Sequence, residues 1–600
     1  MVDSGNSYAE RVSRLVSWGH WFSFFNVIVA MLIGTRYIAE SPWPDTLLGQ
    51  LYLFSSWVGH FGFLVFGLYV LCLFPITFIV PNFKLFRIVG VLASTVGLTV
   101  LLLDTQAYQE LNLHLNPIVW ELLLSDDKNA INAKWQTLFV LVPIIFFVQL
   151  ALAEWVWRKQ RKLSHKRVGR PIAVVFFVSF IFSHLIYIWA DATFYNPITN
   201  QRANFPLSYP MTAKTFLERQ GWFDREEYQE RVERGEANTE VLTYPLETLK
   251  VNKSKSKNYN LMMIVVEDLR ADSMTPETMP ALSEFATQNQ NFPHHYSSGN
   301  DNSASFGLFY GIPATYSANV RHHETQPLFV EQLQYRNYDM GFFSGNDFSS
   351  NIYDDVILSG LDDSLTEQIS KSDTAAVSNW QQWLDNEGNK NWFSLLHLTQ
   401  MQQFEDHVTD DASRKDAGAV LRQAYSTTAS KIDATIEQVL ATLQDKELLD
   451  NTIVVITSDH GWEFNETNTN SWGSNSNYSK YQLQVPMVVH WPNKSAKEWT
   501  HVSSHFDLSV TLMQDLLGVT SNPADFSSGQ NLFNSKNRRW TMAGDAREFA
   551  LISPNEITVL DRYGNYKVFD HNYRRQRDAK PKLSVIMQGL SETKRFYEQQ

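Results

Sequence analysis

The sequence predicts a five-helix transmembrane bundle followed by an α/β domain, which has a mostly parallel sheet and a small C-terminal antiparallel β element. Three observations predict this fold class. Residues 1–191 are rich in Phe, Leu, Val and Trp, whereas the later residues have the polar composition of a soluble domain. Seven basic residues lie between Arg158 and Arg170, in the gap between two long apolar runs. From residue 259 onward, short β-rich runs alternate with helical patterns.

Five apolar segments are long enough to cross a bilayer, which takes about 20 residues. They cover residues 20–39, 57–80, 86–104, 135–157 and 172–191. The connections after the first and third spans are poor in Lys and Arg, whereas those after the second and fourth carry them, and such residues hold a loop in the cytoplasm. We therefore expect a cytoplasmic N-terminus. Because the number of spans is odd, the large C-terminal domain should lie on the opposite side.

The net charge and the cysteine content exclude some functions and some means of stabilising the fold. The formal net charge is −13 and no basic stripe marks the soluble half, which argues against nucleic acid as a partner. Cys72 is the single cysteine, so no disulfide can form within the chain and the soluble domain needs a conventional core. The first apolar stretch lacks a small-x-small cleavage site and is interpreted as an anchor that stays.

The predicted domains are a transmembrane part (1–191), a juxtamembrane linker (192–258) and a soluble α/β part (259–600). In the linker, Pro210 and Thr212 mark the start of an amphipathic helix, with Thr212 as N-cap. Free N–H groups at a helix start can bind an anion, and its place next to the membrane suggests a lipid phosphate. The candidate residues are Thr212, Ala213, Lys214 and Thr215. An ordinary capped helix with a solvated lysine is the alternative.

The soluble half shows the pattern of a parallel sheet covered on both faces. Continuous apolar runs at 261–266, 339–343, 392–398, 452–457 and 485–490 read as buried strands, with helices such as 413–446 between them. Residues 538–570 read as the small antiparallel element, with RYGNYK as a hairpin turn.

Acidic residues follow two of these strands directly. Glu267 and Asp268 come after 261–266, and Asp459 and His460 come after 452–457. Ligands of open α/β sheets bind at the carboxyl ends of strands. Carboxylates with a histidine suit a divalent cation such as Mg²⁺, Mn²⁺ or Zn²⁺. The sequence therefore predicts a metal site at this edge of the sheet.

These motifs resemble a known superfamily. VVEDLR followed by TSDHG is similar to the alkaline phosphatase/sulfatase superfamily, which includes phosphoethanolamine and lipoteichoic-acid-type transferases, over about residues 259–530. The five spans together with GNDNSASFGLFYG, QVPMVVHWP and SHFDLSVTLMQ resemble the YejM (PbgA) family of inner-membrane proteins of Gram-negative envelopes. That second likeness covers nearly the whole chain and places the soluble part in the periplasm.

The superfamily resemblance implies that Glu267, Asp268, Asp459 and His460 hold the metal. It also implies a hydroxyl or thiol nucleophile from the loop 298–306. Asn302 stands where relatives usually have Thr, so Ser303 is the best remaining hydroxyl and Ser305 the next. Catalytic members usually carry histidines where this chain has Ser474 and Gln402. His505 remains, and it is equally well read as a buried structural histidine.

Two functions follow from different classes. The YejM resemblance implies a non-catalytic sensor that binds lipopolysaccharide, lipid A or an acidic phospholipid such as cardiolipin at the periplasmic face. It would signal through its spans to a membrane-anchored regulator of the LapB type, which controls proteolysis of LpxC, the first committed enzyme of lipid A synthesis. The alternative is a metal-dependent phosphatase or phosphoethanolamine-type transferase acting on lipid head groups. The departures from the catalytic set favour the sensor, whereas the intact acids favour the enzyme.

Overall fold

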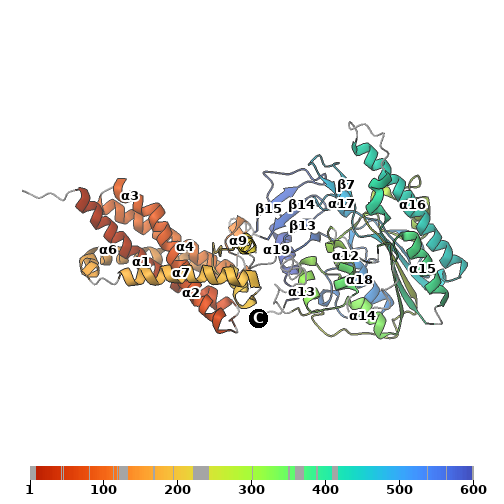
Figure 1. Cartoon of the computed structure of the whole chain (residues 1–600), viewed down its shortest axis with the longest axis horizontal. Coiled ribbons are helices and arrows are strands. Elements are labelled where there is room, and N and C mark those ends of the chain that lie inside the picture. The colour runs from red at the N-terminus through yellow and green to blue at the C-terminus, as the bar shows by residue number, and fades with distance from the viewer. Residues whose placement is uncertain are drawn as a thin grey trace, which may run out of the picture. The chain divides into compact units, whose positions relative to one another are not determined.

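The structure is a computed structural model of the chain that forms two compact units, one within Met1–Thr239 and one within Glu240–Gln599 (Figure 1). It describes residues 8–41, 43–44, 46–79, 82–111, 114–117, 119–120, 133–165, 169–193, 195–220, 242–300, 302–346, 348, 352–358, 370–386, 390–407, 417–536, 538–562 and 564–597.

Long apolar helices build the first unit, coloured red to orange in Figure 1. They are α1 (Tyr8–Glu40), α2 (Leu47–Leu68) with its continuation α3 (Phe74–Ile79), α4 (Phe83–Leu111), α6 (Ala133–His165) and α7 (Gly169–Thr193). Within the described residues, five helical segments are long and apolar enough to cross a membrane, which confirms the five predicted spans. A π turn joins α2 to α3, and Pro75, which lacks the N–H of a regular α-turn, lies just after it.

Small residues let the helices approach closely. A Cβ on Gly59 of α2 would lie 2.6 Å from the backbone of Phe180 in α7, and one on Gly34 of α1 would lie 2.4 Å from the ring of Phe61 in α2. Such contacts are typical of helix packing in lipid, where close backbone approach replaces the hydrophobic effect. The first unit is therefore packed as a membrane bundle.

A buried carboxylate is satisfied inside this bundle. Asp104 Oδ2 of α4 accepts a hydrogen bond from Tyr37 OH (2.6 Å) and lies 2.7 Å from His114 Nδ1, while Oδ1 accepts from the backbone N–H of Leu115 (2.6 Å). An unsatisfied polar group in hydrocarbon is costly. These contacts remove that cost and tie the chain after α4 to α1.

The predicted linker 192–258 contributes to both units. Its first part packs on α2: Tyr195 OH donates to Thr46 Oγ1 (2.9 Å), and Gln201 Nε2 donates to the carbonyl of Gly49 (3.0 Å). Its last part belongs to the second unit, where the N–H of Thr243 donates to the carbonyl of Phe596 (2.8 Å). Residues 221–241 lie outside the described residues.

The second unit contains a seven-stranded sheet with the order β10-β2-β9-β6-β1-β5-β4. The predicted strands are present as β1 (Asn260–Val266), β4 (Asp339–Ser344), β5 (Trp392–Leu398), β6 (Thr452–Ser458) and β9 (Met487–His490). The short β2 (Gln290–Asn291) and β10 (Lys497–Glu498) complete the edge. The four adjacent strands β6, β1, β5 and β4 are parallel, with β4 at one edge of the sheet, whereas β9 runs antiparallel to β6.

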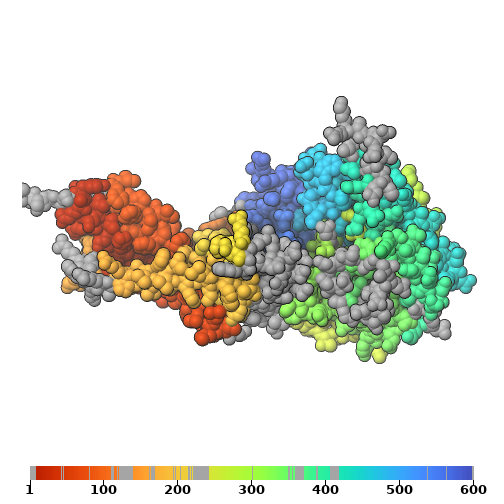
Figure 2. Space-filling model, in the orientation of Figure 1, coloured from red at the N-terminus to blue at the C-terminus, as the bar shows by residue number. Residues whose placement is uncertain are grey.

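Helices cover both faces of this sheet, as its apolar strands predict. Along β1, Leu261, Met263 and Val265 face one core, and Met262, Ile264 and Val266 face the other. The first core includes residues of α12 (Asn302–Tyr310), α14 (Leu328–Tyr335) and α18 (Phe506–Thr511). The second includes α11 (Pro280–Gln288), α15 (Asp373–Asn386) and α16 (Ala417–Asp445). Figure 2 shows the outer surface of α15 and α16 in green to cyan.

The C-terminal antiparallel element is also confirmed. It contains β12 (Thr541–Gly544), β13 (Glu548–Ile552), β14 (Ile557–Asp561) and β15 (Tyr566–Phe569), paired in that order. The predicted turn joins β14 to β15, and Gly564 adopts φ +78° there, a conformation that suits glycine. The helix α19 (Leu583–Glu592) packs on β13.

Candidate functional site

Parallel pairing of β1 with β5 and β6 brings three strand ends together. Val266 lies opposite Ser458 on one side and Leu398 on the other. The N–H of Glu267 donates to the carbonyl of Leu398 (2.9 Å), and the N–H of Asp459 donates to the carbonyl of Val266 (3.2 Å). The predicted residues therefore leave the same edge of the sheet.

Three of the four predicted metal ligands form a tight group at this edge. His460 Nδ1 lies 3.1 Å from Asp268 Oδ1, and His460 Nε2 lies 3.5 Å from Asp459 Oδ2. Asp459 Oδ1 accepts hydrogen bonds from the backbone N–H groups of Asp268 (3.0 Å) and His460 (2.6 Å). All three side chains are buried. The imidazole thus lies between two carboxylates.

A left-handed backbone at Asp268 shapes this group. Its φ is +61°, which is uncommon for a residue other than glycine and tends to occur where function requires it. The surrounding contacts hold this conformation: Tyr425 OH donates to the carbonyl of Asp268 (2.6 Å) and accepts from the N–H of Arg270 (2.9 Å), while the N–H of Leu269 donates to Ser458 Oγ (2.9 Å). The turn out of β1 is therefore fixed by two other elements.

The donor atoms suit a divalent cation, although their positions do not complete a ligand sphere. Burial raises the pKa of the Asp459 carboxyl, His460 beside it opposes this rise, and Asp268 adds to it. The Oδ1 atom of Asp268 is buried and accepts no hydrogen bond of good geometry. A bound cation would favour the charged form of both carboxylates and so lower the pKa of Asp459. Within the described part of the chain, however, no three His, Cys, Asp or Glu side chains gather closely enough to hold an ion.

Glu267 is held away from this group by its own partners. Gln402 Nε2 makes a short hydrogen bond to Glu267 Oε1. The other carboxylate oxygen, Oε2, lies 3.7 Å from His397 Nε2 of β5. Burial lowers the pKa of His397 to about 3, so this imidazole is neutral at ordinary pH. Its Nδ1 lies 3.1 Å from Ser344 Oγ at the end of β4.

Ser303, the predicted nucleophile, stands in the first turn of α12. Its N–H donates to the carbonyl of Asn300 (3.1 Å) and its carbonyl accepts from Ser298 Oγ (3.2 Å). None of its described hydrogen bonds uses the hydroxyl. The structure therefore places the Ser303 side chain at a helix start without joining it to the acidic group.

Ser305 lies closer to the acids through a tyrosine that the sequence did not single out. Ser305 Oγ donates to Tyr353 OH (3.4 Å), and Tyr353 packs against the ring of His397 at 4.7 Å between centroids. Burial raises the pKa of Tyr353, and the nearby charges of Asp459 and Glu267 raise it further. Tyr353 thus links α12 to the acidic edge.

His505 proves to be a structural residue. It is fully buried, its Nε2 lies 3.0 Å from the carbonyl of Ser458, and its Nδ1 lies 3.4 Å from the N–H of Ser298. Burial lowers its pKa to about 4, so the ring is neutral and donates at one nitrogen while it accepts at the other. Of the two interpretations of this histidine, the structure supports the buried structural one.

Sequence and structure comparisons place this site in a family. Residues 5–251 match the family "Domain of unknown function (DUF3413)", and residues 259–519 match the family "Sulfatase". The inner membrane protein YejM of Salmonella typhimurium is 41% identical over 603 residues, covering 99% of this chain and 100% of the relative. An uncharacterized protein of Haemophilus influenzae is 37% identical, covering 99% of this chain and 98% of the relative.

The chain belongs to the YejM family of inner membrane proteins. A solved member of the alkaline phosphatase superfamily from Vibrio parahaemolyticus is 14% identical with a TM-score of 0.45, covering 63% of this chain and 98% of that structure. The match of residues 259–519 to the Sulfatase family agrees with the resemblance expected from VVEDLR and TSDHG.

The superfamily resemblance implies that catalytic members carry histidines at the positions of Gln402 and Ser474 in this YejM-family chain. The structure places the side chain of Gln402 beside Glu267. Ser474, the second such position, follows β8 (Trp472–Gly473) and is half-buried. Neither side chain can act as a general acid or hold a metal as imidazole does.

The predicted lipid-phosphate residues lie in the first unit. The helix α9 (Lys214–Arg219) begins at Lys214, one residue later than an N-cap at Thr212 predicts, and the N–H of Leu217 donates to the carbonyl of Ala213 (2.9 Å). Thr212 is exposed. The side chains of Lys214 and Thr215 lie outside those that the structure describes.

Proposed function

We propose that this chain is an inner-membrane sensor and regulator of lipopolysaccharide and outer-membrane lipid homeostasis. It would bind lipid A or an acidic phospholipid such as cardiolipin at the periplasmic face. It would signal through its spans to a regulator of the LapB type that controls LpxC proteolysis. The YejM family membership and the five spans support the membrane location.

The hydrogen bond from Gln402 to Glu267 carries this proposal. An amide in this position satisfies one oxygen of the carboxylate with a neutral donor. The backbone N–H groups of Asp268 and His460 likewise donate to one oxygen of the Asp459 carboxylate. Protein groups thus satisfy one oxygen of Glu267 and one of Asp459, while Glu267 Oε2 and Asp268 Oδ1 accept no hydrogen bond of good geometry from the described residues. The Ser303 hydroxyl, which takes no part in the described hydrogen bonds, supports the same conclusion.

The charge of the bundle supports the proposed orientation. The guanidinium of Arg14 in α1 lies over the rings of Phe83 and Trp157 at 5.2 and 5.0 Å, and Arg87 lies over Trp157 at 5.0 Å. The start of α1, the start of α4 and the end of α6 therefore share one end of the bundle, next to the basic connection 158–170. Basic residues accumulate on the cytoplasmic side. We place this end in the cytoplasm and the second unit in the periplasm.

Protease accessibility tests that orientation. Protease added to intact spheroplasts should digest the second unit and spare the connection 158–170. Protection of the second unit in sealed spheroplasts, with digestion after lysis, would contradict the placement.

A lipid-binding measurement tests the proposed sensor function. The full-length chain in phosphatidylcholine nanodiscs should bind lipid A, and Lys214→Ala or Thr212→Ala should weaken binding about tenfold, because each removes a contact proposed for the phosphate. Lys253→Ala, an exposed lysine of the second unit, is the matched control. Unchanged affinity in both site variants would show that residues 212–215 are not the phosphate site. If the parent binds neither lipid A nor cardiolipin, the sensor proposal is wrong.

A metal-dependent phosphatase or phosphoethanolamine-type transferase is the second candidate, and the buried Asp268, Asp459 and His460 favour it. With Glu267, these residues would hold the ion, which would polarise a phosphoryl oxygen and lower the pKa of a hydroxyl nucleophile. The test is hydrolysis of an aryl phosphate with Mg²⁺, Mn²⁺ or Zn²⁺ by the purified chain. Metal-dependent turnover that Ser303→Ala or Ser305→Ala abolishes would establish this function. Turnover that neither change affects would point to a contaminant.

A further inference from the structure

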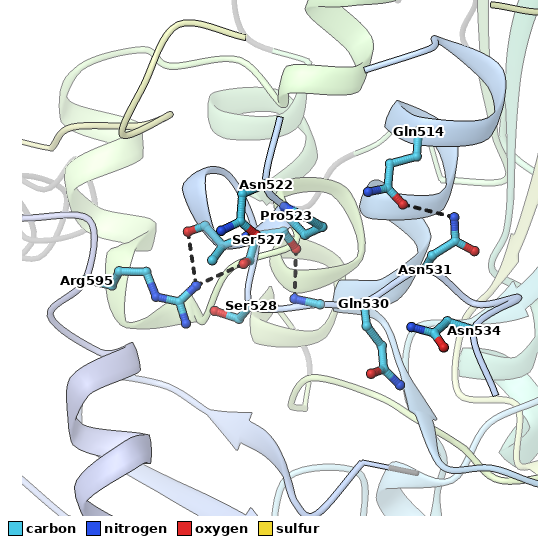
Figure 3. A pocket seen from close by; sticks show the side chains of 11 residues that line it. Gln514, Asn522, Pro523, Ser527, Ser528, Gln530, Asn531, Asn534 and Arg595 are labelled. Atoms are coloured by element: carbon cyan, nitrogen blue, oxygen red, sulfur yellow. Dashed lines mark hydrogen bonds between the residues drawn. The ribbon is translucent and has the colours of Figure 1, made fainter. Parts of the chain in front are cut away.

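The second unit contains a polar cavity that shares no residue with the acidic edge. It has a volume of about 340 Å³ and lies between the chain after α18, the loop 522–534 and Arg595 (Figure 3). Amide side chains make up much of its wall, and they come from Gln514, Asn522, Gln530, Asn531 and Asn534. The volume is in the range of pockets that hold small ligands.

The backbone of this pocket is held rigidly from behind. The N–H of Gln530 donates to the buried carboxylate of Asp507 (2.8 Å). Ser527 Oγ donates to the carbonyl of Gly311 (2.7 Å) and accepts from the N–H of Gly529 (2.9 Å). Figure 3 shows Gln514 and Asn531 turned toward each other on one side of the pocket, with Arg595 on the opposite side. A preorganised wall lowers the entropy cost of binding.

The charge in the pocket is balanced internally. Arg595 forms an ion pair with Glu592, and its Nη1 donates to the carbonyls of Ser527 (3.0 Å) and Ala524 (3.2 Å). Glu592 also accepts from Ser528 Oγ (2.7 Å). Because the guanidinium already faces a carboxylate and two carbonyls, the pocket offers no excess charge to an anion. Its ligand should therefore be neutral.

The unused amide ends indicate what that ligand is. Asn531 Nδ2 donates to Gln514 Oε1 (3.1 Å), and the N–H of Lys536 donates to Asn534 Oδ1 (3.3 Å). Gln530 Nε2 donates to the carbonyl of Lys536 (3.2 Å). None of the described hydrogen bonds uses Gln514 Nε2, Asn534 Nδ2 or Gln530 Oε1. On these three side chains two donors and one acceptor thus remain, and Asn522 Nδ2 adds a further donor. This combination suits hydroxyl groups, which both donate and accept.

We infer that this pocket binds a neutral, hydroxyl-rich ligand, namely a saccharide of one or two rings. The unused amide groups and the internally balanced Arg595 carry this inference. It is independent of the sensor and enzyme proposals, because it uses none of their residues. The sugar can be free in solution or linked to a lipid, and the two sources are distinguished below.

Two nearly isosteric substitutions test the site. Gln514→Glu keeps the oxygen that accepts from Asn531 and replaces the free donor by an anionic oxygen. Asn534→Asp does the same for the oxygen that accepts from Lys536. Asn572→Asp, at an exposed asparagine outside the pocket, is the matched control. Thermal unfolding checks that all variants are folded, and if one is unstable the other carries the test.

The measurement is saturation-transfer NMR on the full-length chain in nanodiscs. The free probes are glucose, galactose, N-acetylglucosamine, maltose and lactose, and the lipid-linked probe is a digalactosyl lipid in the nanodisc. We expect at least one probe to bind, and each pocket variant to weaken it about tenfold or more while the control leaves it unchanged. Binding of the lipid-linked probe alone would identify that source. The inference is overturned if no probe binds, if folded pocket variants bind as the parent does, or if inorganic phosphate competes for the pocket.

Discussion

The two units of this protein differ in which side chains they bury and which they expose. In the membrane bundle, large apolar side chains such as Leu71 (77% exposed) and Leu185 (61% exposed) point outward, while Gly59, Ser23 and Asn26 are buried. In the soluble unit, every residue of the central strand β1 is buried, and the two cores consist of Leu, Ile, Val, Met and aromatic side chains.

The difference follows from the solvent. Lipid tails are as apolar as leucine, so burying a leucine between transmembrane helices gains little, and close contact between small residues stabilises the bundle instead. Water disfavours exposed apolar surface, so the soluble unit gains roughly 25 cal/mol for each Å² that it buries. The same residue type therefore contributes to stability in one unit and has little effect in the other.

The largest expected effect comes from a side chain placed between α2 and α7. Gly59→Leu should abolish the folded bundle, because even its Cβ would lie 2.6 Å from the backbone of Phe180, which cannot move aside as a side chain can. Gly67→Leu in the same helix is the control, since nothing lies within 4 Å of a Cβ there. Size-exclusion profiles in detergent and thermal unfolding report the outcome. Equal behaviour of the two variants would refute the proposed packing of α2 on α7.

A matched pair of leucine-to-alanine substitutions tests whether apolar side chains stabilise the two units differently. Leu396→Ala in β5 should lower the free energy of unfolding of the soluble unit by about 2–5 kcal/mol, because it opens a cavity in a core. Leu185→Ala in α7 should cost less than about 1 kcal/mol, because lipid fills the space. Pulse proteolysis with identification of the fragments follows the unfolding of each unit separately. A large loss at Leu185 would mean that α7 packs against protein on that side.

The last comparison concerns two buried carboxylates. Asp104 of the bundle is satisfied by donors from three residues, whereas Asp459 shares a buried site with Asp268. Burial raises the pKa of Asp459 to about 6, with Asp268 adding to the shift. The folded state therefore binds the extra proton between about pH 4 and pH 6, and stability falls as the pH rises through this window.

Asp459→Asn should remove that pH dependence. In EDTA above about pH 6, we expect the variant to unfold at a higher temperature than the parent, by a free energy on the order of 2 kcal/mol, and the difference should vanish below about pH 4. Asn keeps the oxygen that accepts from the N–H groups of Asp268 and His460. Added Mn²⁺ should stabilise the parent but not the variant if the site binds metal. A variant less stable than the parent in EDTA at pH 7.5 would contradict the raised pKa.

Local patterns were enough to predict much of the soluble unit. The apolar runs gave β1, β5 and β6 to within a residue, because a strand buried on both faces is apolar throughout. The acids after β1 and β6 were identified for the same reason, since parallel strands end at one edge. The direction of β9 was not predictable, because an apolar run of that length reads the same in either orientation.

Two residues of the candidate site escaped the sequence reasoning. His397 lies inside the apolar run of β5 and reads as a core residue, and only the neighbouring position of β1 brings it to 3.7 Å from Glu267. Tyr353 lies in a segment without a strand or regular helix pattern, and its place near Ser305 depends on how the chain after β4 folds back. A polar residue within an otherwise apolar strand was the one available signal.

By itself, the sequence determined the membrane anchor, its number of spans, the class of the soluble fold and the four residues after β1 and β6, because each of these follows from composition or period along a few neighbouring residues. Only the tertiary structure decided how far each span extends, which strands adjoin β1, and how Gln402, His397 and Tyr353 surround the acids. These features depend on contacts between segments tens to hundreds of residues apart, and such contacts leave no periodic trace in the chain.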